Sequence, residues 1–191
     1  LPYDVRDYQM DMVRTSINKR RRALSACTGS GKSLVVYILA RWLLEKEDTD
    51  VLIIVPSMSL VEQIYSDFKE YGWGEIEHYC SRLHSEIKKP TKAEREEMKK
   101  YQILPEHLLK RVVISTWQSL SPKKPEFFRR FGAVICDEAH SAQADVLSSI
   151  IYGCKNSDFR IGLSGPIPEE GLEAHIIAGG IGPTEIVVTT A

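Results

Sequence analysis

The stretch "SACTGSGKS", residues 25–33, decides the fold of this chain of 191 residues. The apolar run "RALSAC" that leads into it is typical of a strand, whereas "LVVYILARWLLEK" after it has the length of a helix and an amphipathic end. Amides at the start of a helix have no partner within the helix, and the helix dipole favours negative charge there. The sequence therefore predicts a phosphate-binding loop between a strand and a helix.

The residue types in this loop suit a nucleotide. Two glycines let the backbone approach phosphate oxygens closely, Lys32 would reach the β and γ phosphates, and the Ser33 hydroxyl would ligate Mg²⁺. Ala26 stands where the usual pattern has its first glycine, so a merely structural glycine turn is the alternative. The predicted site for ATP and Mg²⁺ comprises Thr28, Gly29, Ser30, Gly31, Lys32 and Ser33.

Strand-like and helix-like segments alternate along the rest of the chain. Apolar runs without alternation lie at 51–55, 111–116, 132–140 and 159–165, and helical spacing recurs at 6–17, 60–71 and 146–153. Such strands, separated by helices, predict an α/β fold: a doubly wound, mainly parallel sheet with helices on both faces. Ligands of these folds bind at the carboxyl ends of the strands.

Composition narrows the class of protein. With 25 basic and 26 acidic residues, the net charge of −1 gives no global field that would attract nucleic acid or a membrane, so any such partner must be met locally. The four cysteines show no C-x-x-C spacing, which argues against a disulfide framework or a zinc site and favours a reducing compartment. No apolar run approaches the ~18 residues that a membrane span needs.

A second acidic motif follows a later strand. In "VICDEAH", residues 134–140, Asp137 ends an apolar run and would hold the metal, while Glu138 would orient the attacking water. Two adjacent acids after a strand could instead cap a helix. His140 alone is more often a satisfied hydrogen-bonding residue than a catalyst.

Together, these two motifs resemble motifs I and II of the superfamily 2 helicases and translocases, in the DEAH-type spelling. Four further stretches are similar to other motifs of that superfamily, in the same order along the chain. They are "VRDYQ" (5–9) for the Q motif, "VPSMSLVEQ" (55–63) for motif Ia, "STWQSL" (115–120) for motif Ib and "LSGPIP" (163–168) for motif III.

The resemblance implies roles for individual residues. Arg6 and Gln9 would contact the adenine, Asp137 the metal and Glu138 the water, while His140 and Ser164 would couple the nucleotide site to DNA or to a second domain. The implied DNA-binding residues are Pro56, Ser57, Gln63, Thr116, Trp117 and Gln118. Hydroxyls, amides and loop N–H groups grip a nucleic-acid backbone without reading bases. For Trp117 a core aromatic is an equal alternative.

The overall likeness is to phage recombination helicases, which implies an ATP-driven motor acting on forked DNA, Holliday junctions and R-loops in recombination and repair. Localisation would then be cytoplasmic, in the host cell if a phage encodes the chain. An ATPase module of a restriction-enzyme motor and a nucleotide-gated DNA-binding switch are alternatives, and RNA is a possible substrate. Pro166 departs from motif III because it lacks the usual hydroxyl and an N–H, which puts coupling at this position in doubt.

The expected domain organisation is a single RecA-like domain at 1–180, with 181–191 starting a linker to a missing second RecA-like domain. The chain starts at Leu1 and nothing after residue 165 resembles motifs IV to VI, so we expect a piece of a longer protein with little turnover alone. "TKAE" at 91–94 predicts a capping box on a solvated helix. The basic run "NKRRR" at 18–22 could bind DNA, but it should lie at the amino edge of the sheet, away from the motifs, which favours a solvated loop.

Overall fold

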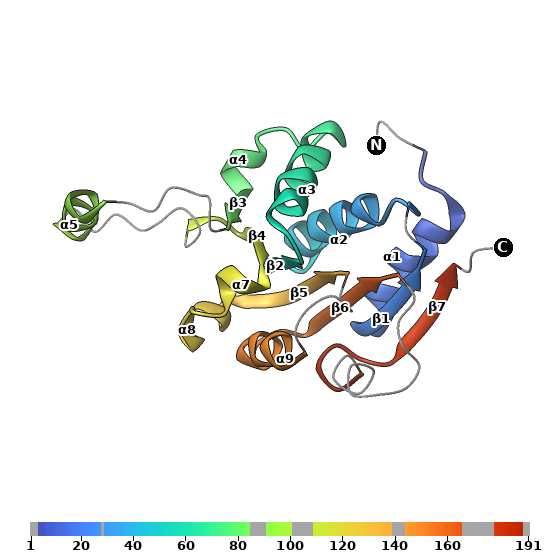
Figure 1. Ribbon diagram of the computed structural model, residues 1–191. Helices are drawn as coiled ribbons and strands as arrows, with labels where there is room; N and C mark the ends of the chain where they lie inside the picture. Colours follow the sequence, from blue (N-terminus) through green and yellow to red (C-terminus); the bar gives the residue numbers. More distant parts are fainter. Residues whose placement is uncertain are drawn as a thin grey trace.

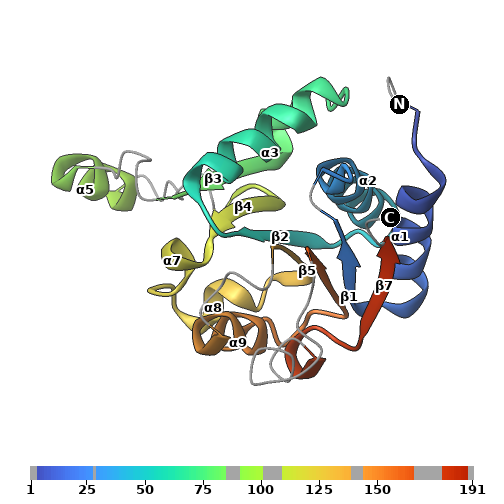
Figure 2. The same cartoon turned by 45° about the vertical axis from the view of Figure 1, so that its right-hand side comes forward.

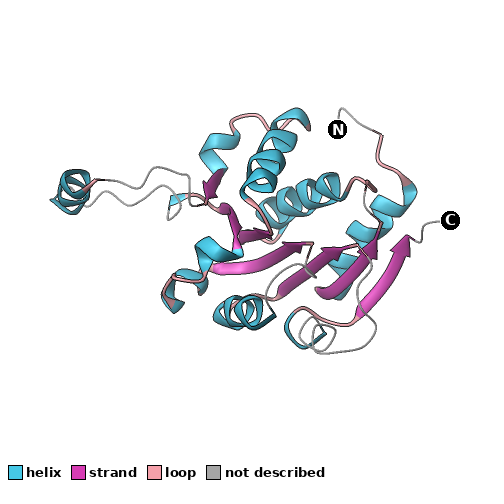
Figure 3. Ribbon diagram, in the orientation of Figure 1, coloured by secondary structure: helices cyan, strands magenta, loops and turns pink. Residues whose placement is uncertain are grey.

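One parallel sheet organises the structure. The computed structural model describes residues 4–27, 29–84, 91–100, 109–138, 144–165 and 178–188. Within these ranges the strands pair in parallel in the order β3-β4-β2-β5-β6-β1-β7, side by side as in Figures 1 and 3. Their bounds are β1 Arg21–Ala26, β2 Asp50–Val55, β3 Cys80–Leu83, β4 Val112–Thr116, β5 Phe131–Asp137, β6 Phe159–Ser164 and β7 Thr184–Val188.

Helices cover both faces of this sheet (Figure 2). One face carries α1 (Asp7–Lys19), α2 (Lys32–Lys46), α3 (Met58–Glu70) and α4 (Ile76–Tyr79). The other carries α7 (Trp117–Leu120), α8 (Pro125–Phe128) and α9 (Ala144–Gly153). Helix α5 (Lys92–Lys100) lies apart from the sheet in both views. The two covered faces match the predicted doubly wound fold.

The central strand β2 explains why its apolar run does not alternate. Ile53 packs in the core under α2 and α3, whereas its neighbour Leu52 packs in the core under α8 and α9. Successive side chains of a strand point to opposite faces, so a sheet covered on both sides needs apolar residues at every position. Both side chains are fully buried.

The predicted helices and strands agree with the structure to within a few residues at each end. Short elements that carry no clear period, such as α4 and α8, were not anticipated. The C-terminal segment also differs from expectation, because Thr184–Val188 forms edge strand β7 where a linker was expected to begin at 181. The unpaired edge of β1 offers N–H and C=O groups, and the β-branched run in β7 suits a strand.

Of two charged segments, the one in α5 has its predicted capping box, whereas residues 18–22 form the end of α1 and the start of β1 where a solvated loop was predicted. In the capping box of α5, Thr91 N donates to a Glu94 carboxylate oxygen (2.6 Å) and Glu94 N donates to Thr91 Oγ1 (3.3 Å). In the basic run at the amino edge, the Arg20 guanidinium lies over the Phe159 ring and Arg21 donates to Ser157 O at 3.2 Å. These arginines contact the domain itself.

All four cysteines are free thiols. Burial raises the pKa of Cys80 and Cys136 well above the usual range and raises the pKa of Cys154 to about 12. Because these three thiols stay protonated in neutral solution, they are weak nucleophiles and act as small core residues.

Candidate nucleotide site and nucleic-acid groove

The predicted phosphate-binding loop connects β1 to α2 at the carboxyl edge of the sheet (Figure 1). Gly29 and Gly31 have φ angles of +80° and +71°, in the left-handed region, and Gly31 is the N-cap of α2. Ser30 N donates to Cys27 O, which closes the turn, and Ser30 Oγ is buried without a hydrogen-bond partner among the described residues. A tight turn with an orphaned hydroxyl at a helix N-terminus fits a phosphate group.

Helix α1 holds this loop in place. The Gln9 side-chain amide donates to Ser30 O (3.0 Å) and Gly31 O (3.3 Å), and its oxygen accepts from Arg6 N (3.0 Å). The Tyr8 hydroxyl also donates to Ser30 O at 2.9 Å and accepts from the Arg6 guanidinium. The structure therefore gives Gln9 a role in shaping the loop. The contact of Tyr8 was not anticipated: it lies within the "VRDYQ" stretch, but only Arg6 and Gln9 of that stretch were assigned a role.

The loop lysine pairs with the second acid of the later motif. Lys32 Nζ lies 2.9 Å from Glu138 Oε1 and donates to Ala26 O at 3.4 Å, and the lysine side chain is only 8% exposed. Glu138 adopts a positive φ of 51° directly after β5. The tertiary structure thus brings together two residues 106 positions apart in the sequence (138 − 32), because β1 and β5 end at the same edge.

Gly165 connects the acid motif to the end of β6. Its N–H donates to Glu138 Oε2 at 3.3 Å, and its carbonyl accepts from the Ser25 hydroxyl at 3.3 Å. Ser164, the predicted coupling residue, is fully buried next to it at the end of β6. Asp137 Oδ1 accepts from Glu138 N at 3.1 Å. Three predicted motifs therefore meet around one carboxylate, with Gly165 as a contact that sequence reasoning missed.

The hydroxyl of Ser33 shares a 2.8 Å hydrogen bond with the Tyr71 hydroxyl. Tyr71 directly follows α3, and its ring packs edge-on to Tyr37, one turn after Ser33 on α2. The predicted Mg²⁺ ligand is thereby oriented by a residue outside every motif. Hydroxyl and carboxylate oxygens are suitable ligands for Mg²⁺, so the side chains of Ser33 and Asp137 fit this metal.

Replacing Gly31 with alanine tests how α1 holds the loop. A Cβ there would lie 2.4 Å from Gln9 Nε2, at a φ that alanine rarely adopts. The left-handed conformation costs such a residue about 1–2 kcal/mol, and displacing the Gln9 amide costs about 1 more. We expect the free energy of unfolding, measured by denaturant titration, to fall by about 2–3 kcal/mol.

The matched control is Gly29→Ala. Its φ of +80° imposes the same backbone cost, but a Cβ at this position meets no atom within 4 Å. Gly29→Ala should therefore lose only about 1–2 kcal/mol. Equal losses for the two variants would contradict the role of the Gln9 contact.

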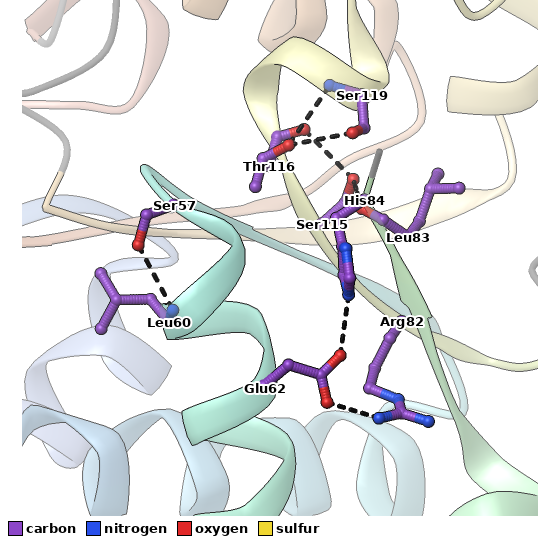
Figure 4. Close-up of polar contacts among 9 residues, drawn as sticks. All are labelled: Ser57, Leu60, Glu62, Arg82, Leu83, His84, Ser115, Thr116 and Ser119. Atoms are coloured by element: carbon purple, nitrogen blue, oxygen red, sulfur yellow. Dashed lines mark hydrogen bonds and ion pairs between the residues drawn. The ribbon is translucent and has the colours of Figure 1, made fainter. Parts of the chain in front are cut away.

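A groove of about 540 Å³ opens beside this site, at the carboxyl ends of β2 and β4. It contains four of the six predicted DNA-binding residues, and its polar walls include two helix caps (Figure 4). Ser57 Oγ accepts from Leu60 N and Thr116 Oγ1 accepts from Ser119 N, each at 3.3 Å. The lining residues are Pro56, Ser57, Met58, Leu83, His84, Thr116, Gln118, Ser119, Pro122 and Lys123.

Several predicted residues lie elsewhere. Gln63 is exposed on α3 and does not line the groove, and Trp117 packs half-buried against the core under α9, as expected of a core aromatic. Thr28, His140 and Pro166 lie outside the described residues.

Comparison with known proteins agrees with this geometry. Residues 2–169 match the family model for the type III restriction enzyme, res subunit. The chain belongs to this family. The resemblance of its motifs to those of superfamily 2 helicases is thereby confirmed. Across the described residues, no helix combines the length and the apolar character needed to cross a membrane.

Individual relatives of this chain are helicases. The ATP-dependent DNA helicase uvsW of Enterobacteria phage T4 is 35% identical over 186 residues, covering 96% of this chain and 34% of that protein. A crystal structure of the UvsW helicase from bacteriophage T4 matches with a TM-score of 0.78 and 30% identity, over 96% of this chain and 60% of that one.

A more distant structure shows the fold alone. The hypothetical ATP-dependent RNA helicase from Sulfolobus tokodaii matches with a TM-score of 0.70 and 19% identity, over 95% of this chain and 53% of that one. The predicted RecA-like fold is confirmed by these matches. The chain spans about a third of the length of the curated relatives that it matches.

Proposed function

We propose that this chain is the ATP-binding motor domain of a DNA helicase or translocase that acts on branched DNA in recombination and repair. Forks, Holliday junctions and R-loops are the proposed substrates. The observation that carries the proposal is the Lys32–Glu138 ion pair, because it joins a phosphate-binding loop to an acid poised for hydrolysis. The 35% identity to a phage DNA helicase supports DNA as the substrate.

Residues at the carboxyl edge would hold Mg-ATP. The loop amides of residues 28–33 and the Lys32 ammonium would bind phosphates, while Ser33 and Asp137 would hold the Mg²⁺. Arg6 and Gln9 would meet the adenine, since both lie beside the loop on the N-terminal side of α1. Bound Mg²⁺ supplies charge neutralisation on the phosphates.

Glu138 would act after Lys32 exchanges its partner. In this structure the lysine charge is satisfied by the Glu138 carboxylate at 2.9 Å. Phosphate oxygens would compete for Lys32, and a released carboxylate could accept a proton from water. Glu138 would still accept a hydrogen bond from Gly165 N. A shift of the Glu138 side chain would therefore also displace Gly165 and its neighbour Ser164 at the end of β6. His140 and Ser164 are the proposed coupling residues.

The groove would bind the nucleic-acid backbone. Pro56, Ser57, Thr116 and Gln118 line it, with Lys123 as a basic group. Hydroxyls, helix N-termini and one cation suit phosphate contacts that read no base. For Gln63 the proposal is weaker because it does not line the groove, and the packing of Trp117 favours its structural role.

A second RecA-like domain is the proposed partner. The arginine fingers that accelerate phosphoryl transfer by about 10³–10⁵ would come from that domain. The low share of each relative that this chain covers is consistent with such a division.

The deciding experiment measures Mg-ATP binding, ATP turnover and remodelling of forked DNA by the protein. We expect binding by this chain with little turnover, and DNA-stimulated turnover with strand separation once the second domain is present. Nucleotide-dependent DNA binding without any separation of strands would contradict the helicase proposal. The res-subunit family match would then favour the alternative of a restriction-enzyme motor or a nucleotide-gated switch.

A further inference from the structure

His84 is a buried, titratable residue in the wall of the groove that no motif includes. It directly follows β3 and lines the groove together with Ser57, Thr116 and Lys123. Its side chain is 6% exposed. Nε2 lies 2.7 Å from Glu62 Oε1, whereas Nδ1 is buried without a hydrogen-bond partner among the described residues. A buried polar atom without a partner is uncommon and points to a group that is absent from the structure.

Glu62 fixes the orientation of this imidazole (Figure 4). Its second oxygen accepts from the Arg82 guanidinium, which also lies over the Tyr65 ring. Partial burial of Glu62 raises the pKa of its carboxyl, but the hydrogen bonds from His84 and Arg82 outweigh this and lower it. The carboxylate is therefore an anion that accepts a hydrogen from Nε2, which leaves Nδ1 as the site where a further proton adds.

Without that proton, the charges of the Glu62–Arg82 pair beside His84 cancel. Glu62 on α3 and Arg82 on β3 are oppositely charged partners, and Lys123 after α7 is the remaining charged residue that lines the groove with His84. A proton at Nδ1 adds one positive charge to the groove wall. It also creates a buried donor that needs an acceptor, which an oxygen of a backbone phosphate supplies directly or through a water.

We propose that His84 is a phosphate-binding residue of this groove and that it takes up one proton from solvent when a nucleic-acid strand binds. This inference rests on the proposed nucleic-acid role of the groove. Imidazoles change charge between about pH 5 and 8. The affinity for an anion that binds the charged form therefore increases as pH falls through that range. One coupled proton makes the association constant change by up to about tenfold per pH unit.

The test measures binding of a labelled oligothymidylate by fluorescence anisotropy at several pH values and salt concentrations. Affinity should rise as pH falls, and at low pH the slope of log K against log salt should be steeper by about 0.7, one single-strand phosphate contact. His84→Gln should flatten the pH profile and remove that difference in slope, because the amide replaces Nε2 but not Nδ1. His78→Gln is the control, since His78 is exposed on α4.

Two further variants distinguish a hydrogen bond made at the Nδ1 position from the effect of the Glu62 carboxylate on His84. His84→Asn places an amide N–H near the Nδ1 position and should retain binding without pH dependence. Glu62→Gln keeps an acceptor for Nε2 but removes the anion, so the rise in affinity should shift to lower pH. Circular dichroism at each pH verifies that the variants are folded.

The outcomes distinguish this inference from the proposed function. If the wild-type protein binds no oligonucleotide at any pH, the nucleic-acid role of the groove itself fails. If it binds but His84→Gln retains the wild-type pH profile and salt slope, His84 has only a structural role and the inference alone is overturned.

Discussion

Lys32→Ala should lower the affinity for Mg-ATP by about 10- to 100-fold, since hydrogen bonds to charged groups contribute about 1.5–3 kcal/mol. The lysine is nearly buried and its ammonium is fixed at 2.9 Å from Glu138, so it is already directed at the loop where phosphates would bind. Equilibrium binding of a fluorescent ATP analogue measures the effect.

A matched control distinguishes the loss of the lysine at the loop from the loss of any positive charge on α2. Lys46→Ala removes a lysine from the exposed last turn of the same helix α2 and should leave nucleotide affinity unchanged. Because Lys32→Ala also leaves the Glu138 carboxylate without its partner, thermal unfolding of both variants is measured alongside. Wild-type affinity in a folded Lys32→Ala protein would contradict the proposed phosphate site.

Glu138→Gln should slow turnover strongly while nucleotide binding persists. The amide cannot accept a proton from water, and the loss of a general base typically costs about 10²–10⁴ in rate. The glutamine side chain keeps an acceptor for Gly165 N, so the contact with β6 survives. Lys32 would lose its competing anion and become more available to phosphates, so affinity for Mg-ATP should stay the same or increase.

The measurement for Glu138→Gln combines equilibrium binding with single-turnover hydrolysis by a protein that joins this chain to the proposed second RecA-like domain. Glu47→Gln, at the exposed C-terminus of α2, is the control that should keep wild-type turnover. Undiminished hydrolysis by Glu138→Gln would assign the base to another residue. Loss of binding together with hydrolysis would instead show that the carboxylate is needed to assemble the loop.

Local sequence was sufficient for most elements of the fold. The glycine loop, the capping box of α5 and the strand that ends at Asp137 were predicted within a few residues, because each depends on neighbours a few positions away. Strand β7 was not predicted. Its pairing depends on the free edge of β1, far away in the sequence.

The candidate site shows the same division. Motif residues such as Lys32 and Glu138 were identified because their chemistry is restricted to few residue types. The contacts of Tyr8, Tyr71 and Gly165 were missed, since each depends on a hydrogen bond to an element that is distant in the sequence. A tyrosine hydroxyl or a backbone amide leaves no signature in composition or period.

The sequence by itself determined the doubly wound fold, the glycine loop before α2 and the position of the acids after β5, because apolar period and residue chemistry act over short ranges. Only the tertiary structure decided that Lys32 pairs with Glu138, that Gln9 holds the loop, and that His84 lies buried in the groove. Those contacts depend on which strands end side by side at one edge of the sheet, and strand order is set by packing across the whole domain.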